Sequence, residues 1–176
     1  NEQVIKVVTG IRRCGKSTLL KQFQDRLLEE GVSQEQIISI NFEDLDYEDL
    51  LDYKALYAYI GERLCPDKMT YIFLDEIQKV DSFQKAVDSL FIKENTDIYI
   101  TGSNAYLLSG DLATLLTGRF VEISMLPLSF AEYLECSGET GEQALASYMK
   151  FGGFPYLTQM ENTADKVDTY LEGIYN

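Results

Sequence analysis

The chain has 176 residues, of which 45% are hydrophobic and 25% charged, and its formal net charge is −14. This length allows one domain, or one domain and the beginning of a second. Direct nucleic-acid binding is not expected, because it needs clustered Lys and Arg, and no run reaches the roughly 18 apolar residues needed to cross a membrane. Three widely spaced cysteines argue against a disulfide framework and favour a reducing, cytoplasmic setting.

Apolar residues recur with the periods of strands and helices in turn along most of the chain. Short apolar runs predict strands at residues 4–9, 36–42, 70–74, 97–101 and 120–124. Apolar residues at helical spacing predict helices at residues 16–30, 47–64 and 82–92, with short helical pieces over 104–117. This alternation predicts an α/β fold with a mainly parallel sheet between helical layers, whose ligands gather at the carboxyl ends of the strands.

The alternation of strand and helix stops after Pro127. Residues 129–151 and 163–175 are expected to be helical, with a break at the Gly-Gly-Phe-Pro sequence of residues 152–155. We therefore expect a core domain over residues 1–127 and a small helical extension over residues 128–176. Because the chain starts at Asn1 directly before the first strand and stops abruptly, we expect it to be a piece of a longer protein.

The strongest functional signal is the sequence Gly-Ile-Arg-Arg-Cys-Gly-Lys-Ser at residues 10–17, which matches the phosphate-loop pattern G-x-x-x-x-G-K-S/T, the Walker A motif. Its two glycines allow a tight turn that points backbone N–H groups at a phosphate, and a helix N-terminus follows. Lys16 can contact the β- and γ-phosphates, and the Ser17 hydroxyl can bind Mg²⁺. We expect a nucleoside triphosphate to bind here, through the following residues: Gly10, Ile11, Arg12, Arg13, Cys14, Gly15, Lys16, Ser17 and Thr18.

The distribution of charge supports this position for the site. The first 24 residues carry five basic side chains and one acidic one, whereas residues 29–52 carry nine acids and no base. The side chains of Arg12 and Arg13 can point to phosphate, to a partner or to solvent. The acidic segment is either a solvated face or a docking surface for a basic partner.

A pair of carboxylates, Asp75 and Glu76, ends the third predicted strand. An aspartate at the tip of an apolar strand beside a phosphate loop can hold Mg²⁺, as in the Walker B motif. The glutamate after it can polarise a water for attack on the γ-phosphate. Alone, Asp75 would be read as a strand-end residue and Glu76 as a solvated charge. Their occurrence with the phosphate loop in an alternating fold predicts hydrolysis of the bound nucleoside triphosphate.

Two further positions are candidates for contact with the nucleotide. Ser103 or Asn104, after the fourth predicted strand, can contact the γ-phosphate or the attacking water as a sensor, or can cap the next helix. Arg119, just before the fifth strand, can reach a neighbouring subunit's nucleotide as an arginine finger, or can form a surface salt bridge. Adenine is favoured, because the Asn-Lys-x-Asp sequence that reads guanine in GTPases is missing.

An ordered set of five motifs resembles the prokaryotic AAA-type ATPases. These motifs are the phosphate loop, Tyr-Ile-Phe-Leu-Asp-Glu-Ile-Gln at 71–78, Ile-Thr-Gly-Ser-Asn at 100–104, Thr-Gly-Arg-Phe at 117–120 and Pro-Leu-Ser-Phe at 127–130. The resemblance implies a P-loop NTPase core, a three-layer sandwich with a five-stranded sheet of order 5-1-4-3-2. It also implies Mg-ATP as the ligand and Asp75 and Glu76 as the residues of hydrolysis. By the same resemblance, the region of Ser103 and Asn104 is the sensor, and Arg119 has the position of the arginine finger.

Proteins of the family that this chain resembles continue past residues 152–155 into a helical lid and a larger C-terminal domain. The resemblance therefore implies a truncated N-terminal fragment whose ATPase activity is coupled to a part of the protein outside this chain, with a homo-oligomer or that C-terminal effector domain as partner. The fragment alone is expected to have weak turnover or none. An alternative is a regulatory or signalling switch that binds ATP and rarely hydrolyses it.

Overall fold

The computed structural model describes residues 4–102, 116, 118–159 and 164–175. The described chain separates into two compact units, one of Asn1–Thr9 with Lys16–Ser124 and the other of Gly10–Gly15 with Met125–Asn176. The second unit thus combines most of the phosphate loop with the helices of the C-terminal extension. The predicted helical pieces at 104–117 fall almost wholly outside the described residues.

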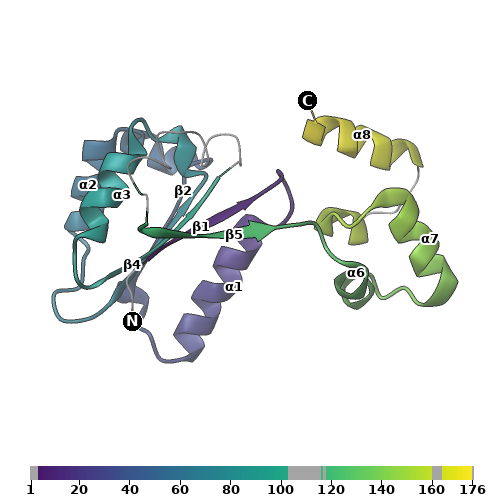
Figure 1. The fold of residues 1–176 in the computed structure, drawn as a ribbon, viewed down its shortest axis with the longest axis horizontal. Helices are drawn as coiled ribbons and strands as arrows, with labels where there is room; N and C mark the ends of the chain where they lie inside the picture. Colours follow the sequence, from purple (N-terminus) through teal and green to yellow (C-terminus); the bar gives the residue numbers. More distant parts are fainter. Residues whose placement is uncertain (1–3, 103–115, 117, 160–163, 176) are drawn as a thin grey trace. The chain divides into compact units, whose positions relative to one another are not determined.

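The first unit is built on a five-stranded sheet whose strands lie in the order β2-β3-β4-β1-β5 (Figure 1). The pairs β2–β3, β3–β4 and β4–β1 are parallel. This order is the predicted 5-1-4-3-2 in reverse, so the predicted fold class is confirmed. The strands are β1 (Ile5–Gly10), β2 (Ile37–Asn41), β3 (Thr70–Asp75), β4 (Thr96–Thr101) and β5 (Phe120–Met125).

Helices cover both faces of this sheet (Figure 1). The helices of the first unit are α1 (Lys16–Glu29), α2 (Tyr53–Gly61) and α3 (Phe83–Phe91), with short 3-10 turns η1 (Gln34–Gln36), η2 (Leu45–Leu50) and η3 (Ile77–Lys79). On one face, Phe23 of α1 contacts the rings of Phe73 and Tyr99, at centroid distances of 6.1 and 5.1 Å. Phe73 and Tyr99 are paired in register on β3 and β4, and their rings stack at 4.9 Å.

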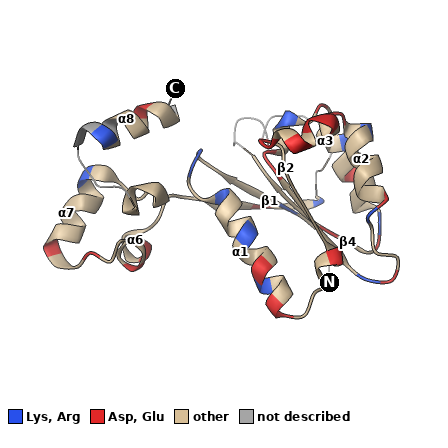
Figure 2. Ribbon diagram, turned by 180° about the vertical axis from the view of Figure 1, so that it is seen from behind, with Lys and Arg blue, Asp and Glu red and all other residues tan. Residues whose placement is uncertain are grey.

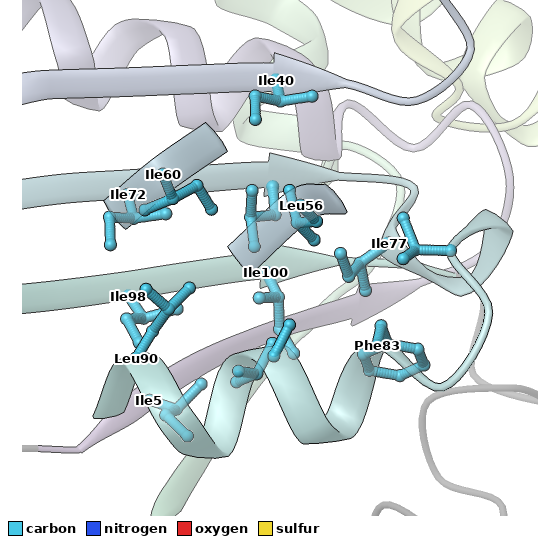
Figure 3. Packing of buried hydrophobic residues seen from close by; sticks show 14 of the residues in the cluster. Ile5, Ile40, Leu56, Ile60, Ile72, Ile77, Phe83, Leu90, Ile98 and Ile100 are labelled. Carbon is cyan, nitrogen blue, oxygen red and sulfur yellow. The ribbon is translucent and has the colours of Figure 1, made fainter. Parts of the chain in front are cut away.

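The opposite face of the sheet holds the main hydrophobic core, packed against α2 and α3 (Figure 3). Because side chains alternate along a strand, the neighbours of Phe73 and Tyr99 point to this side. Ile72, Ile98 and Ile100 are at most 2% exposed. Burial of each such side chain stabilises the fold by about 1.5–3 kcal/mol.

The single helix predicted at residues 47–64 is wrong, because the chain there forms η2 and then the shorter α2. Asp52 has an extended backbone and its side chain caps α2, accepting hydrogen bonds from the N–H groups of Lys54 and Ala55. Next to it, the N–H of Asp81 donates to Leu51 O at 2.8 Å. This contact with a residue about 30 positions away interrupts the helix that local periodicity predicts.

The second unit is helical, and one of its two predicted helices is divided. Residues 129–151 form α6 (Phe130–Ser137) and α7 (Gly141–Phe151), because Gly138 ends α6 in the left-handed conformation, with φ 67°. A turn η4 (Pro155–Thr158) and α8 (Ala164–Tyr175) follow. Phe154, Leu157 and Val167 form a small core. No described helix is both long and apolar enough to span a membrane.

Candidate nucleotide-binding site

The phosphate loop joins the end of β1 to the start of α1 and has the backbone of a tight turn. Gly10 and Gly15 have φ angles of 154° and 105°, and Arg13 adopts the left-handed conformation at φ 65°. A Cβ on Gly10 would lie 2.6 Å from Met125 O and 2.8 Å from Cys14 Sγ, so the turn has no room for a side chain there. Left-handed residues within such a turn direct successive N–H groups to one side, as an anion site requires.

The residues after the turn are those that the sequence analysis assigns to phosphate and metal. Lys16 begins α1 and is only 5% exposed. Ser17 and Thr18 lie exposed in the first turn of the helix. The beginning of α1 is basic and its later part is mixed in charge (Figure 2). Lys16, Ser17 and Thr18 lie at the N-terminus of α1, where the helix dipole and the N–H groups of the first turn favour a bound anion such as a triphosphate.

The sheet brings the end of β3 near the end of β1. Leu74 is in register with Ile100, and Thr101 is in register with Val8. Parallel strands lie about 4.8 Å apart, so the ends of β3 and β1, with β4 between them, are roughly 10 Å apart. Asp75, the last residue of β3, is therefore at the same edge of the sheet as the carboxyl end of β1.

Thr101 forms hydrogen bonds with both Asp75 and Glu76, a role that was not predicted from the sequence. Its fully buried hydroxyl donates a hydrogen bond to Asp75 Oδ1 and accepts one from the N–H of Glu76 at 3.0 Å. Asp75 is 7% exposed, and this bond partly compensates for the loss of solvent around its carboxylate. A threonine at the end of a strand carries no such signal by itself; the strand pairing gives it this role.

Glu76 has a strained backbone. Its φ and ψ angles are 56° and 44°, in the left-handed region, which non-glycine residues rarely adopt. Such conformations persist where the surrounding structure enforces them and concentrate at functional sites. Here the turn η3 directly follows, and the side chain of Ile77 is buried in the main core. The backbone strain therefore falls on the residue expected to act on the attacking water.

Arg119 lies at the opposite end of β1 from the phosphate loop. Its carbonyl oxygen accepts a hydrogen bond from the N–H of Ile5 at 2.8 Å. Ile5 is the first residue of β1 and Gly10 the last, and a strand of this length spans roughly 16 Å. Its guanidinium forms an ion pair with Asp88 and lies 5.7 Å from the centre of the Phe91 ring. This is the salt bridge given as the alternative; the finger role stays a prediction. Ser103 and Asn104 lie outside the described residues.

The phosphate loop also contacts the C-terminal helices within the second unit. The Arg13 guanidinium lies 5.1 Å from the centre of the Tyr170 ring on α8. Tyr170 in turn contacts the rings of Phe154 and Tyr156 at 6.3 and 5.1 Å. The left-handed backbone of Arg13 thus accompanies a side chain that reaches a helix more than 150 positions later. The direction of the Arg13 side chain could not be predicted from the sequence.

The residue types fit a nucleotide with Mg²⁺. A magnesium ion in such sites is held by one or two protein oxygens and by the substrate phosphates. The Ser17 hydroxyl and the Asp75 carboxylate are oxygen ligands of this kind, and no cluster of three or more His, Cys, Asp or Glu side chains occurs in the described parts of the chain. The glycine-bounded turn and the buried Lys16 carry N–H and ammonium donors of the kind that phosphate binding requires.

A parallel sheet of this order, with a glycine loop between β1 and α1, defines the P-loop NTPase fold. Residues 2–134 match the AAA domain family, and the chain belongs to this family. Solved structures share the fold. Cdc6p from Pyrobaculum aerophilum matches with a TM-score of 0.51 and 11% sequence identity, over 77% of this chain and 43% of that protein chain. C. elegans PCH-2 matches with a TM-score of 0.51 and 15% sequence identity, over 84% of this chain and 40% of that protein chain. A DNA polymerase III gamma subunit-related protein from Thermotoga maritima matches with a TM-score of 0.53 and 12% sequence identity, over 85% of this chain and 54% of that protein chain.

Two curated relatives match almost the whole chain. An uncharacterized protein of Haemophilus influenzae is 42% identical over 178 residues, which cover 98% of this chain and 44% of that protein. An uncharacterized protein of Methanocaldococcus jannaschii is 34% identical over 191 residues, with coverages of 97% and 41%. The chain thus spans less than half the length of these relatives.

Proposed function

We propose that this AAA domain binds Mg-ATP at the phosphate loop and hydrolyses it to ADP and phosphate. The observation that carries the proposal is the Thr101 hydroxyl, which holds the Asp75 carboxylate and the Glu76 backbone together at the sheet edge where β1 enters the loop. A buried acid at this position, next to a second one with an enforced backbone, is the arrangement that metal-assisted attack by water needs.

Each residue has a role in this reaction. Lys16 and the loop N–H groups bind the β- and γ-phosphates, and Ser17 and Asp75 would hold Mg²⁺, which neutralises charge on the phosphates. Glu76 accepts a proton from a water whose oxygen bonds to the γ-phosphorus. The bond from that phosphorus to the bridging oxygen breaks, and its electron pair leaves with ADP. Ser103 or Asn104 would sense the γ-phosphate.

We further propose that the nucleotide is coupled to the rest of the protein through the C-terminal helices. Residues 10–15 belong to the same compact unit as α6, α7 and α8, and Arg13 contacts Tyr170. A loop that rearranges around phosphate would therefore move the contact of Arg13 with α8. The same contact favours a second candidate function, a switch that binds ATP and rarely turns it over.

Replacement of Lys16 tests nucleotide binding. In the full-length protein, we expect Lys16→Ala to weaken ATP binding about 100-fold, because a charge-assisted contact to phosphate is worth roughly 1.5–3 kcal/mol. Calorimetric titration with ATP and Mg²⁺ measures this change in affinity. A separate competition experiment tests the preference for adenine, since unlabelled GTP should compete poorly with labelled ATP for the wild-type site. Lys21→Ala is the matched control, since Lys21 lies on the same helix and pairs with Asp25 at 3.3 Å. Equal affinities in the two variants would contradict the proposed site.

Arg119 gives a test of action between subunits. Because it lies at the far end of β1 from its own loop, we propose that it acts on the nucleotide of a neighbouring subunit. Arg119→Ala and Lys16→Ala proteins are each expected to be inactive, and mixing them should restore part of the phosphate release. If mixtures stay as inactive as the separate variants, Arg119 is the surface ion pair with Asp88 and not a finger.

A further inference from the structure

Gln78 binds the carboxylate of the proposed catalytic glutamate. It lies in η3, two residues after Glu76, and its Nε2 donates a hydrogen bond to Glu76 Oε2. The other end of the same amide, Gln78 Oε1, is buried and accepts no hydrogen bond from any residue that the structure describes. The role of Gln78 was not apparent from the sequence, where it only completes the motif at residues 71–78.

This arrangement is unfavourable for Gln78 itself. A glutamine that turned outward would expose both ends of its amide to water, whereas here one end is buried without a described partner. The backbone of Glu76 is left-handed, which is also unfavourable. The buried amide oxygen without a described partner and the left-handed backbone thus belong to two residues that are joined by one hydrogen bond. Buried polar groups that lack a partner call for an explanation, and a role at a reacting group is a recognised one.

The turn that carries Gln78 is held firmly in place. Ile77, between the two residues, is fully buried and belongs to the same hydrophobic core cluster as Phe83 (Figure 3). The N–H of Lys79 donates to Glu76 O at 3.2 Å, which closes the turn. The core therefore sets the position of the Gln78 amide relative to Glu76, and the hydrogen bond does not depend on a mobile surface side chain.

Glu76 is consequently held at two points. Thr101 Oγ1 accepts a hydrogen bond from its N–H, and Gln78 binds Oε2 of its carboxylate. A carboxylate fixed through one oxygen can turn only about that bond, so the direction of its other oxygen is restricted. Preorganised groups of this kind lower the entropy lost when the attacking water is aligned.

We propose that Gln78 is a positioning residue for ATP hydrolysis: it fixes Oε2 of Glu76 so that Oε1 is presented to the attacking water. This inference rests on the proposed function, in which Glu76 accepts the proton of that water. It assigns Gln78 no contact with ATP or Mg²⁺. Loss of Gln78 should therefore slow the chemical step and leave nucleotide binding as it is.

The test uses Gln78→Met and Gln78→Ala in the full-length protein, alone and combined with Glu76→Gln. Gln78→Met keeps the approximate length of the side chain and adds no charge but removes the donor, and it guards against a packing defect in Gln78→Ala. We expect kcat for phosphate release to fall about 10- to 100-fold in either variant, the range typical of groups that orient a reacting residue. KM and the Kd for ATP should stay unchanged. Gln34→Met, at an exposed glutamine of η1, is the matched control.

The combined variants separate positioning from general damage. When Glu76 is already Gln, the further change at Gln78 should have no additional effect on the residual rate, because residues that act as a unit are non-additive. Losses that multiply would overturn the inference. Wild-type turnover that requires Glu76 but persists in both Gln78 variants would overturn it and leave the proposed function intact. An absence of wild-type turnover would overturn both.

Discussion

Replacing Glu76 with Gln is expected to lower kcat for ATP hydrolysis about 100- to 10,000-fold, the range associated with loss of a general base. The amide has nearly the shape of the carboxylate, but it does not take a proton from water. The variant should bind ATP at least as tightly as the wild type, because it loses a negative charge near the phosphates. Phosphate release under saturating Mg-ATP, with the Kd measured separately, checks both statements.

Glu62→Gln is the matched control for Glu76→Gln, because Glu62 is an exposed glutamate that follows α2. Its turnover should equal that of the wild type. If the full-length wild type releases no more phosphate than Glu76→Gln, the hydrolysis proposal is wrong and the ATP-binding switch is the remaining function. If both variants lose turnover equally, the effect of Glu76→Gln is not specific to the proposed base.

The change Gly153→Ala is expected to destabilise the helical unit by about 3 kcal/mol, the upper part of the usual range for overpacking. An added Cβ would lie 2.1 Å from Leu128 O and 3.1 Å from Leu128 C. Leu128 has little freedom to move, since its N–H donates to Gly153 O at 2.7 Å and its own carbonyl accepts from the Tyr148 hydroxyl at 2.9 Å. The clash involves backbone atoms, so no side-chain rotation relieves it.

Urea unfolding followed by tyrosine fluorescence measures this effect, because the chain has twelve tyrosines and no tryptophan. Gly61→Ala is the control: it lies at the end of α2 with no atom within 4 Å of the added Cβ. That substitution should be neutral or stabilise the chain by about 0.5–1 kcal/mol, since alanine is the better helix residue. Equal unfolding midpoints for the two variants would show that the backbone of residues 128 and 153 separates easily.

Much of the first unit was predictable from local patterns. Buried parallel strands are short and continuously apolar, so their approximate positions are visible in the sequence. The strand order came from the resemblance to AAA-type ATPases, and the topology confirms it. The helix at 47–64 was wrong because Asp52 and the contact between Leu51 and Asp81 interrupt it. Local periodicity contains no information about a partner 30 residues away.

The candidate site, like the fold, was predictable from the sequence only in part. The phosphate loop and the pair Asp75 and Glu76 are visible in the sequence, because their chemistry requires particular residue types at close spacing. Their roles in binding and hydrolysis stay predictions. The contributions of Thr101 and Gln78 were not visible, since threonine and glutamine occur in many structural settings and each acts here through one hydroxyl or one amide.

The sequence by itself determined the fold class, the family and the segments that carry phosphate chemistry, because these depend on periodicity and on residues adjacent in the chain. Only the tertiary structure decided what surrounds those segments. Strand pairing places Thr101 between Asp75 and the backbone of Glu76, and the buried turn after β3 directs Gln78 to the Glu76 carboxylate. The packing of the second unit joins Arg13 to Tyr170. Such contacts join residues 2 to more than 150 positions apart, and their geometry exists only once the core is packed.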